Sequence, residues 1–363
     1  MNVLAARTSV CLAFVAALGL GASSARAVAE SSSWFSRDET TIPKLAPAPK
    51  STAPEAGPNA PAAVGMKTRM PSLVPATGDD AAYTAFDQGQ YLTALKLAEE
   101  AAARGEPQAN TLIGRIYADG LGVQKDNGKA DEYFKRASDM GDVQGTFALG
   151  MSYAQGRGVK KDFKTAGELF EKAALTGNAE ANYNLGLLFL NGNGKPLSPI
   201  RAYQHIRYAA EKGIPQAEYD LADLFQTGTG VDANALEAAR WLSRAADHGL
   251  AVAQYDYAVR LLQGYGLTND EVKIPALLKA AAEKDIPGAQ NRLGYVYLEG
   301  IKVKKDPIEA AKWRLIAQKN GIEDKAFDEI LAKMSKADRL KAAVEASAWM
   351  DRIAVDPEMS AVP

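Results

Sequence analysis

Two consecutive stretches of the chain align residue for residue without a gap. Residues 145–180 read GTFALGMSYAQGRGVKKDFKTAGELFEKAALTGNAE, and residues 181–216 read ANYNLGLLFLNGNGKPLSPIRAYQHIRYAAEKGIPQ. Counted from the first residue of each stretch, glycine occupies positions 12, 14 and 33 in both, and alanine occupies position 29. Self-similarity at a fixed period of 20–50 residues is the signature of a repeat array. The register extends to six repeats: 109–144, 145–180, 181–216, 217–252, 253–288 and 289–324.

The first half of each repeat predicts a short helix. Positions 1, 5 and 9 lie on one helical stripe and are alanine, glycine, leucine, isoleucine or aromatic residues, while position 6 is glycine or alanine and allows another helix to approach closely. Position 12 ends the helix, because glycine adopts the left-handed cap conformation without steric cost. It is glycine in all six repeats: Gly120, Gly156, Gly192, Gly228, Gly264 and Gly300.

The second half predicts another helix. Position 18 carries a side chain that can accept hydrogen bonds from the free N–H groups of a first helical turn. Position 33 is glycine in five repeats and Asp285 in the other. A hairpin of this size cannot bury its apolar side alone, so neighbouring repeats must stack, which predicts an all-α array. The predicted caps are Asp126, Asp162, Ser198, Asn234, Asp270 and Asp306.

The pattern A-x-x-x-L-G-x-x-Y-x-x-G-x-G-V-x-x-D-x-x-x-A, seen from Gly145 to Ala166, resembles the Sel-one-like repeat family, a relative of the tetratricopeptide repeat. The resemblance implies a right-handed α/α solenoid of 36-residue helical hairpins whose members act as scaffolds, adaptors or regulators. Lys195 replaces the loop valine and Lys302 replaces the second loop glycine, so these two turns are expected to differ locally.

The flanks are predicted to cap the array. Residues 79–108 read as a degenerate N-terminal hairpin with Gly89 in its turn, and residues 325–355 read as C-terminal capping helices. Such caps with a polar outer side keep a solenoid soluble. The apolar side of the C-terminal cap is predicted to contain Ile330, Leu331, Leu340, Val344, Ala348 and Trp349.

The N-terminal region predicts export. Residues 1–27 combine Arg7, an apolar run over 10–20 and the small-x-small end Ala25–Arg26–Ala27, which indicates a signal peptide cleaved after Ala27. Residues 28–78 form a Pro/Ala-rich linker expected to be disordered, and residues 356–363 a tail. We therefore expect a periplasmic protein without an integral membrane segment after cleavage, with secretion from the cell as an open alternative.

Within the linker, Trp34–Phe35 is either a docking motif or remnant hydrophobicity near the processing site.

Composition argues against several classes of function. The 363 residues contain 42 Lys and Arg, 44 Asp and Glu, two His and one Cys, so neither a nucleic-acid surface nor a Cys/His metal cage is expected. His205 is expected to pack in the core and His248 to be a last-turn residue that is solvated or faces the helix dipole. With no Ser-x-x-Lys arrangement and no paired cysteines, we expect no catalytic residues, cofactor or metal.

In solenoids of this type the first helices line the concave face. Positions 4, 7 and 11 point away from the buried stripe and predict a binding surface. The acidic side chains of Asp220, Asp223 and Asp256 favour a basic peptide or an amine-bearing polymer such as a peptidoglycan stem peptide, and the alternative is a merely solvated face. The predicted site residues are Arg115, Asp119, Met151, Gln155, Asn184, Asn191, Asp220, Asp223, Asp256, Gln263, Arg292, Tyr295 and Glu299.

Position 3 carries aromatic side chains, for which packing between repeats is favoured over a binding ladder: Phe147, Tyr183, Tyr219 and Tyr255.

These observations predict a non-catalytic scaffold or regulator that binds a protein or peptide of the cell envelope. A sensor kinase and the cell-wall machinery are both compatible partners, and no nucleic acid is expected. Two alternatives of other classes stay open: an enzyme, or its accessory, acting on peptidoglycan or β-lactams, and a secreted host-directed effector.

Overall fold

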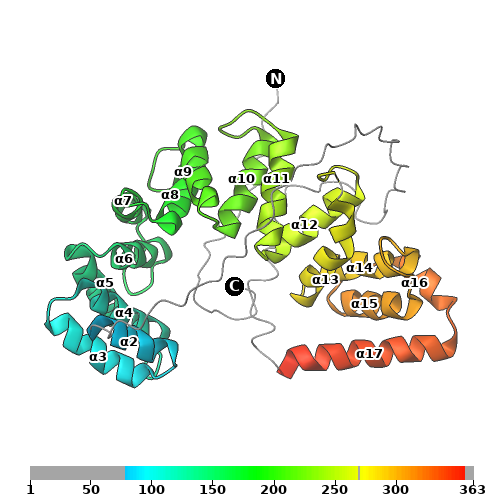
Figure 1. The fold of residues 1–363 in the computed structure, drawn as a ribbon, viewed down its shortest axis with the longest axis horizontal. Helices are drawn as coiled ribbons and strands as arrows, with labels where there is room; N and C mark the ends of the chain where they lie inside the picture. The colour runs from blue at the N-terminus through cyan, green and yellow to red at the C-terminus, as the bar shows by residue number, and fades with distance from the viewer. Residues whose placement is uncertain (1–77, 269, 356–363) are drawn as a thin grey trace, which may run out of the picture. The chain divides into compact units, whose positions relative to one another are not determined.

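The structure is a computed structural model that describes residues 78–268 and 270–355 (Figure 1). The predicted signal peptide, the tail and all but the last residue of the predicted linker lie outside this range. Every regular element in the described residues is helical, as the sequence predicts. These residues form two compact units. The N-terminal unit comprises 78–152 and 156–160, and the C-terminal unit comprises 153–155, 161–268 and 270–355.

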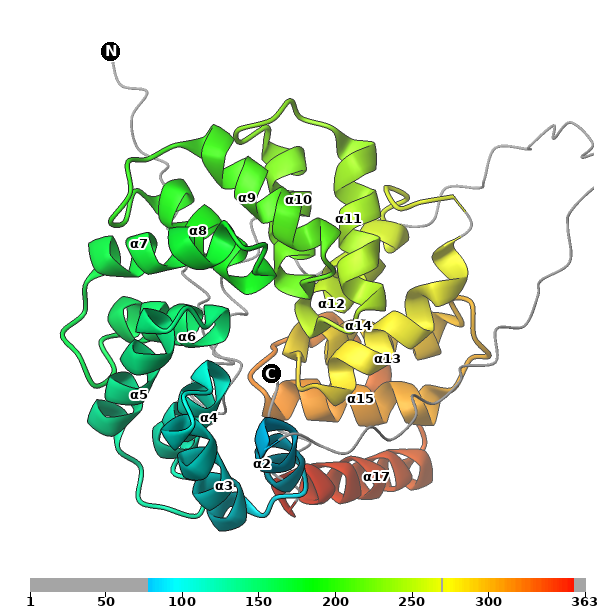
Figure 2. The same ribbon diagram turned by 60° about the vertical axis from the view of Figure 1, so that its left-hand side comes forward.

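Consecutive helices form hairpins joined by short loops (Figure 2). Closely packed pairs are α2 with α3, α4 with α5, α8 with α9, α10 with α11, and α14 with α15. The helices of the N-terminal unit are α2 (Gly78–Asp87), α3 (Tyr91–Ala103), α4 (Pro107–Asp119), α5 (Asn127–Asp139) and α6 (Val143–Gln155), whose last residues belong to the C-terminal unit. The C-terminal unit continues with α7 (Phe163–Ala174), α8 (Ala179–Asn191), α9 (Pro199–Glu211), α10 (Pro215–Thr227), α11 (Ala235–Asp247), α12 (Ala251–Leu262), the 3₁₀ helix η1 (Asp270–Lys273), α13 (Ile274–Glu283), α14 (Pro287–Glu299), α15 (Pro307–Lys319), α16 (Lys325–Ala332) and α17 (Lys336–Val355).

Left-handed residues end the helices where the sequence predicts. Five of the six position-12 glycines are C-caps with φ between 68° and 73°. The sixth, Gly264, is also left-handed, but α12 ends at Leu262 and its C-cap is Gln263. Asp285 keeps the backbone of the glycines it replaces, with φ 59°, and Lys302 is also left-handed, with φ 56°. The carboxylate of Asp285 accepts hydrogen bonds from Gln290 and Asn320, which compensates for the strain.

Five of the six predicted caps of the second helices are confirmed, and the prediction for Asp270 is wrong. Asp126, Asp162, Ser198, Asn234 and Asp306 each accept a hydrogen bond from a first-turn N–H. Asp270 instead begins η1, and its Oδ2 accepts a hydrogen bond of 2.5 Å from the Tyr257 hydroxyl. Because the carboxylate bonds to that hydroxyl, it caps no helix, and α13 begins only at Ile274.

The first helix of each repeat begins two residues before the repeat boundary that the sequence predicts. For example, α4 begins at Pro107, whereas the predicted first repeat begins at Ala109. Their N-caps therefore occupy position 34 of the preceding repeat. At two of these positions, Asp142 and Asn178 accept hydrogen bonds from N–H groups three residues on. In other repeats the same position is Ile214, Leu250 or Ile286, which make no side-chain cap. No single residue type therefore identifies this N-cap in the sequence.

The small residues of the repeat lie where helices touch. A Cβ atom added at Gly186 would lie 2.6 Å from Ile206 Cγ1, and one at Gly114 would lie 2.5 Å from Phe134 Cε1. The position-29 alanines are all at most 1% exposed: Ala137, Ala173, Ala209, Ala245, Ala281 and Ala317. Alanine and glycine at these positions let the helices pack closely.

The predicted apolar side of the C-terminal cap is partly wrong. Leu331 and Trp349 are buried, but Ile330, Leu340 and Val344 are 38%, 66% and 61% exposed, and Ala348 is exposed as well. Instead α17 packs on α15 through a narrow stripe of Ala342, Ala346 and Trp349, whose indole lies edge-on to that of Trp313 at 5.3 Å. Two alanines one turn apart allow the close approach that leucine and valine would prevent.

Candidate functional site

Positions 3 and 4 of neighbouring repeats are bonded to each other in the C-terminal unit. The Tyr183 hydroxyl of α8 donates to Asp220 Oδ2 of α10 at 2.9 Å, and the Tyr219 hydroxyl of α10 donates to Asp256 Oδ2 of α12 at 2.7 Å. One repeat further, Arg292 Nε of α14 donates to the Tyr255 hydroxyl at 3.4 Å. These contacts confirm that the three tyrosines pack between repeats.

Two of the three acidic side chains of the predicted surface are therefore engaged internally. Asp256 is only 1% exposed, and its Oδ1 has no hydrogen-bond partner among the described residues. Burial raises the pKa of Asp256 to about 7, and burial with the nearby charge of Asp223 raises the pKa of Asp220 to about 7. The predicted acidic group thus carries less negative charge at neutral pH than its sequence suggests.

Asp256→Asn tests this burial by changing how stability depends on pH. Folding raises the pKa of Asp256 from 3.8 to about 7. The protonated carboxyl therefore contributes its full stabilisation below about pH 4, and the free energy of unfolding falls as the pH rises from there through 7. We expect Asp256→Asn to be more stable than the parent by about 2 kcal/mol at pH 8 and equal to it near pH 4, in urea unfolding. Asp247→Asn, at an exposed aspartate of α11, is the control and should follow the parent at both pH values. A parent-like pH profile for Asp256→Asn would mean that Asp256 stays ionised in the fold.

Other predicted residues at positions 4 and 7 are also held by neighbours. Asn184 is 5% exposed and donates to the Glu180 carbonyl. The Tyr295 hydroxyl donates to Asp324 Oδ1. In the N-terminal unit, the Arg115 guanidinium lies 4.8 Å from the centroid of the Phe86 ring, while Met151 is partly exposed.

Position 11, near the C-terminal end of each first helix, is exposed in the last three repeats and half-buried in the first three. The Asp119 side chain is 17% exposed, and Gln155 Oε1 is buried without a hydrogen-bond partner among the described residues. Several are anchored within their own helix, as when the Asn191 amide donates to the Leu187 carbonyl at 2.9 Å. Burial raises the pKa of Asp119. This row, one polar residue per repeat, is Asp119, Gln155, Asn191, Thr227, Gln263 and Glu299.

Sequence reasoning missed the buried polar residues at position 2. Gln254 Nε2 donates to the Ala246 carbonyl at 3.2 Å, and Gln290 Nε2 donates to the Ala282 carbonyl at 3.2 Å. Asn182 makes the equivalent bond at 3.4 Å, so the side chain clamps a carbonyl eight residues earlier, in the last turn of the preceding helix. The sequence signal for this set is that position 2 is polar in all six repeats. In the structure each of these residues is at most 9% exposed: Asn110, Thr146, Asn182, Glu218, Gln254 and Gln290.

The two histidines belong to separate packing networks. The His205 ring stacks on Phe189 with centroids 5.7 Å apart, and burial lowers its pKa, as expected for a packed residue. His248 is 45% exposed, but its Nδ1 lies 2.7 Å from Oε2 of the fully buried Glu218, which also pairs with Arg244 at 2.9 Å. The expectation that His248 is solvated or faces the helix dipole is therefore incomplete, because the ring also partners a buried carboxylate.

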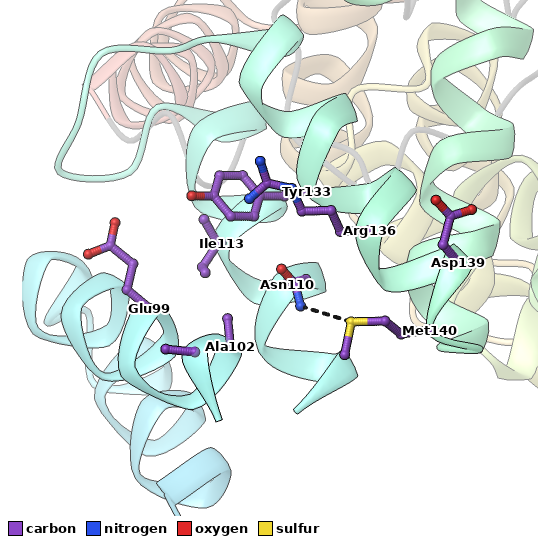
Figure 3. A pocket seen from close by; sticks show the side chains of 9 residues that line it. Glu99, Ala102, Asn110, Ile113, Tyr133, Arg136, Asp139 and Met140 are labelled. Atoms are coloured by element: carbon purple, nitrogen blue, oxygen red, sulfur yellow. Dashed lines mark hydrogen bonds between the residues drawn. The ribbon is translucent and has the colours of Figure 1, made fainter. Parts of the chain in front are cut away.

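An open pocket of about 490 Å³ lies in the N-terminal unit among α3, α4 and α5 (Figure 3). The pocket is lined by Glu99, Ala102, Ala103, Asn110, Ile113, Tyr133, Arg136, Asp139 and Met140.

In the described residues, no group of three or more His, Cys, Asp or Glu could hold a metal ion. No helix of the described ranges is long and apolar enough to cross a membrane.

Comparisons with known proteins identify the repeat. A Sel1 repeat protein from Oxalobacter formigenes has a solved structure that is 26% identical, with a TM-score of 0.57 over 69% of this chain and 99% of that chain. The structure of c5321, a protective antigen of uropathogenic Escherichia coli strains with an SLR fold, is 25% identical, with a TM-score of 0.48 over 78% of this chain and 69% of that chain. A comparison with curated proteins gave no match.

The family model described as Sel1 repeat matches residues 107–142, 143–178, 179–214, 215–250, 251–285 and 287–315. These matches confirm the predicted solenoid of helical hairpins, and their boundaries follow the helix starts rather than the alanines. Sel1 repeat proteins generally mediate protein–protein interactions, and the scaffold is typically non-catalytic. With six repeats over more than half of its length, the chain belongs to the Sel1 repeat family.

Proposed function

We propose that this protein is a non-catalytic scaffold or regulator of the cell envelope that binds a protein or peptide through its first helices. The observation that carries the proposal is the row of polar side chains at position 11, exposed at Thr227, Gln263 and Glu299. Position 4 forms bonds between repeats at Asp220, Asp256 and Arg292, whereas position 11 is polar in all six repeats and exposed in the last three. A solenoid presents such a row as an extended surface suited to a peptide segment or a protein edge.

Residence in the periplasm is part of the proposal and rests on the sequence of residues 1–27. A positively charged start, a short apolar run and a small-x-small end are the features of a cleavable signal peptide. Cell fractionation of the full chain, with N-terminal sequencing of the product, should find a periplasmic protein that begins at Val28. Retention of Met1 in a cytoplasmic fraction would contradict this location without bearing on the binding surface.

Site-specific photo-crosslinking tests the surface. A photoreactive amino acid is placed at Gln263 or Glu299, at the exposed ends of α12 and α14, and the cells are irradiated intact. We expect a discrete adduct from these positions, because a partner on the first helices would lie within reach. Matched controls at Arg207 and Lys279, exposed on the second helices α9 and α13, should give no such adduct. Equal crosslinking from all four positions would contradict a first-helix surface.

Charge reversal is better placed at Glu299 than at Asp220. The Asp220 carboxylate accepts the Tyr183 hydroxyl, so Asp220→Lys would disturb the packing of α8 on α10 as well as any binding. Glu299 is exposed at the end of α14, and its replacement leaves the contacts between repeats intact. Loss of the crosslinked adduct in Glu299→Lys would therefore report on binding alone.

A further inference from the structure

The pocket among α3, α4 and α5 lies where position 2 lacks the amide clamp that Asn182, Gln254 and Gln290 make, a clamp that Thr146 and Glu218 also lack. Gln254 and Gln290 each donate to a carbonyl eight residues earlier. The corresponding carbonyl for Asn110 is that of Ala102, which lines the pocket and accepts the backbone N–H of Gly105. Asn110 makes no bond to it, so the junction between the N-terminal hairpin and the first repeat is left open.

Asn110 is a buried polar side chain with incomplete hydrogen bonding. It is 4% exposed, and its Nδ2 makes only two long contacts, 3.5 Å to the Glu106 carbonyl and 3.7 Å to Met140 Sδ (Figure 3). Its Oδ1 accepts no hydrogen bond from the described residues. Because this oxygen is not among the side-chain atoms buried without a partner, it is open to the water of the pocket, where an N–H donor of a ligand can replace that water.

The remaining lining residues specify the charge and shape of that ligand. Glu99 has no ion-pair partner among the described residues, whereas Asp139 is already paired with Lys135 at 2.7 Å. The Arg136 guanidinium lies 4.9 Å from the centroid of the Tyr133 ring and forms part of the opposite wall. With Asp139 paired to Lys135, Glu99 is the acidic side chain of the lining that is left to face a cation, and the apolar surface comes from Ala102, Ala103, Ile113 and Met140.

We propose that this pocket binds a lysine side chain of a peptide. The ammonium group donates to Asn110 Oδ1 and faces the Glu99 carboxylate, and the aliphatic stem lies over the alanines and the Met140 thioether. Long basic side chains bury their methylene groups on apolar surface in this way while keeping the charged end among polar groups. The pocket is formed by two second helices and α4, so it is a site distinct from the position-11 row and does not depend on the proposed function.

The test uses the peptide acetyl-Ala-Lys-Ala-amide and NMR titration of the mature protein. We expect saturable shifts of the Asn110 side-chain amide with a Kd of about 1 mM, as for a ligand of this size. The isosteric peptide with norleucine in place of lysine should bind at least tenfold more weakly. Asn110→Gln should abolish the shifts at Ile113, because glutamine reaches the Ala102 carbonyl as Gln254 and Gln290 reach theirs and fills the pocket.

Three further variants distinguish the site from general effects. Glu99→Gln, at an exposed position, should weaken lysine binding several-fold while leaving norleucine binding unchanged. Glu100→Gln, its exposed neighbour outside the pocket, and Gln254→Asn, in the C-terminal unit, should bind like the parent. If Asn110→Gln does not fold, the Glu99→Gln and Glu100→Gln pair still decides the question. Equal binding of the lysine and norleucine peptides, or equal effects of these two variants, would overturn the proposal.

Discussion

Arg314→Ala is expected to lower the free energy of unfolding by about 3 kcal/mol. Arg314 is 1% exposed and is the largest fully buried side chain in the described residues. Its Nε and Nη2 donate to the two carboxylate oxygens of Asp328 at 2.8 and 2.9 Å, and its Nη1 donates to the Ile322 carbonyl at 3.0 Å. The side chain therefore joins α15 to the turn and helix that close the array.

The loss should come from the cavity and the unpaired carbonyl rather than from a buried charge. Asp328 is 41% exposed, so water can solvate its carboxylate once the guanidinium is gone. The Ile322 carbonyl has no such alternative if the cavity stays apolar, and a large vacated volume forfeits packing contacts. Because each repeat contacts only its neighbours, the damage should be greatest at the C-terminal end.

Urea unfolding measures the total effect, and amide hydrogen exchange locates it. We expect faster exchange over α16 and α17 in Arg314→Ala, with unchanged exchange over α8 and α10. Arg314→Lys keeps the charge but lacks the planar fork, so it should recover only part of the stability. A loss below about 1 kcal/mol, or uniform acceleration of exchange along the chain, would show that this side chain does not secure the cap.

The local rules of the repeat were enough to predict its helices. Glycine at position 12 and an acceptor at position 18 act on their own few residues, so their consequences can be read without knowing what packs nearby. Ser198 and Asp306 cap the helices that the sequence assigns to them. Asp285 shows that even a departure in residue type can preserve the backbone conformation of the position.

The site was harder to predict because its exposure depends on contacts between repeats. Asp220 and Asp223 are three residues apart on α10, and it is Asp220 that accepts the hydroxyl of Tyr183 from the preceding repeat. Spacing along one helix cannot show that a hydroxyl on the previous helix reaches one carboxylate. The same reason explains the error at Asp270, whose carboxylate is taken by Tyr257, and the oversight at position 2.

Apolar patterning of the last helix misled for another reason. Leu340 and Val344 suggested a buried side by their size, whereas α17 packs through Ala342 and Ala346. Hydrophobicity ranks leucine and valine above alanine, but a terminal helix that lies close against α15 selects the smaller residues. The sequence identified the helix, and only the packing identified its buried face.

Gly230→Ala is expected to destabilise the protein by about 3 kcal/mol, whereas Gly264→Ala should cost only about 1 kcal/mol. Both glycines are left-handed, with φ 75° and 78°, so an alanine meets a similar backbone strain at each. A Cβ atom at Gly230 would overlap the carbonyl group of Pro199 in the first turn of α9, but one at Gly264 would meet no atom within 4 Å. The difference between the two variants therefore isolates the packing of one repeat on the next.

Other repeats indicate that this contact is part of the architecture. A Cβ atom at Gly194 would overlap the carbonyl group of Phe163, and one at Gly158 would overlap Asp131 Oδ2 and come within 2.5 Å of the Asn127 carbonyl oxygen. The one non-glycine at this position, Lys302, follows the repeat in which, among the described residues, a 3₁₀ turn (η1) precedes the second helix. Equal losses of unfolding free energy for Gly230→Ala and Gly264→Ala, measured in urea, would contradict the packing role. A larger loss for Gly230→Ala would explain why lysine occurs at this position only in the repeat that follows η1 and α13.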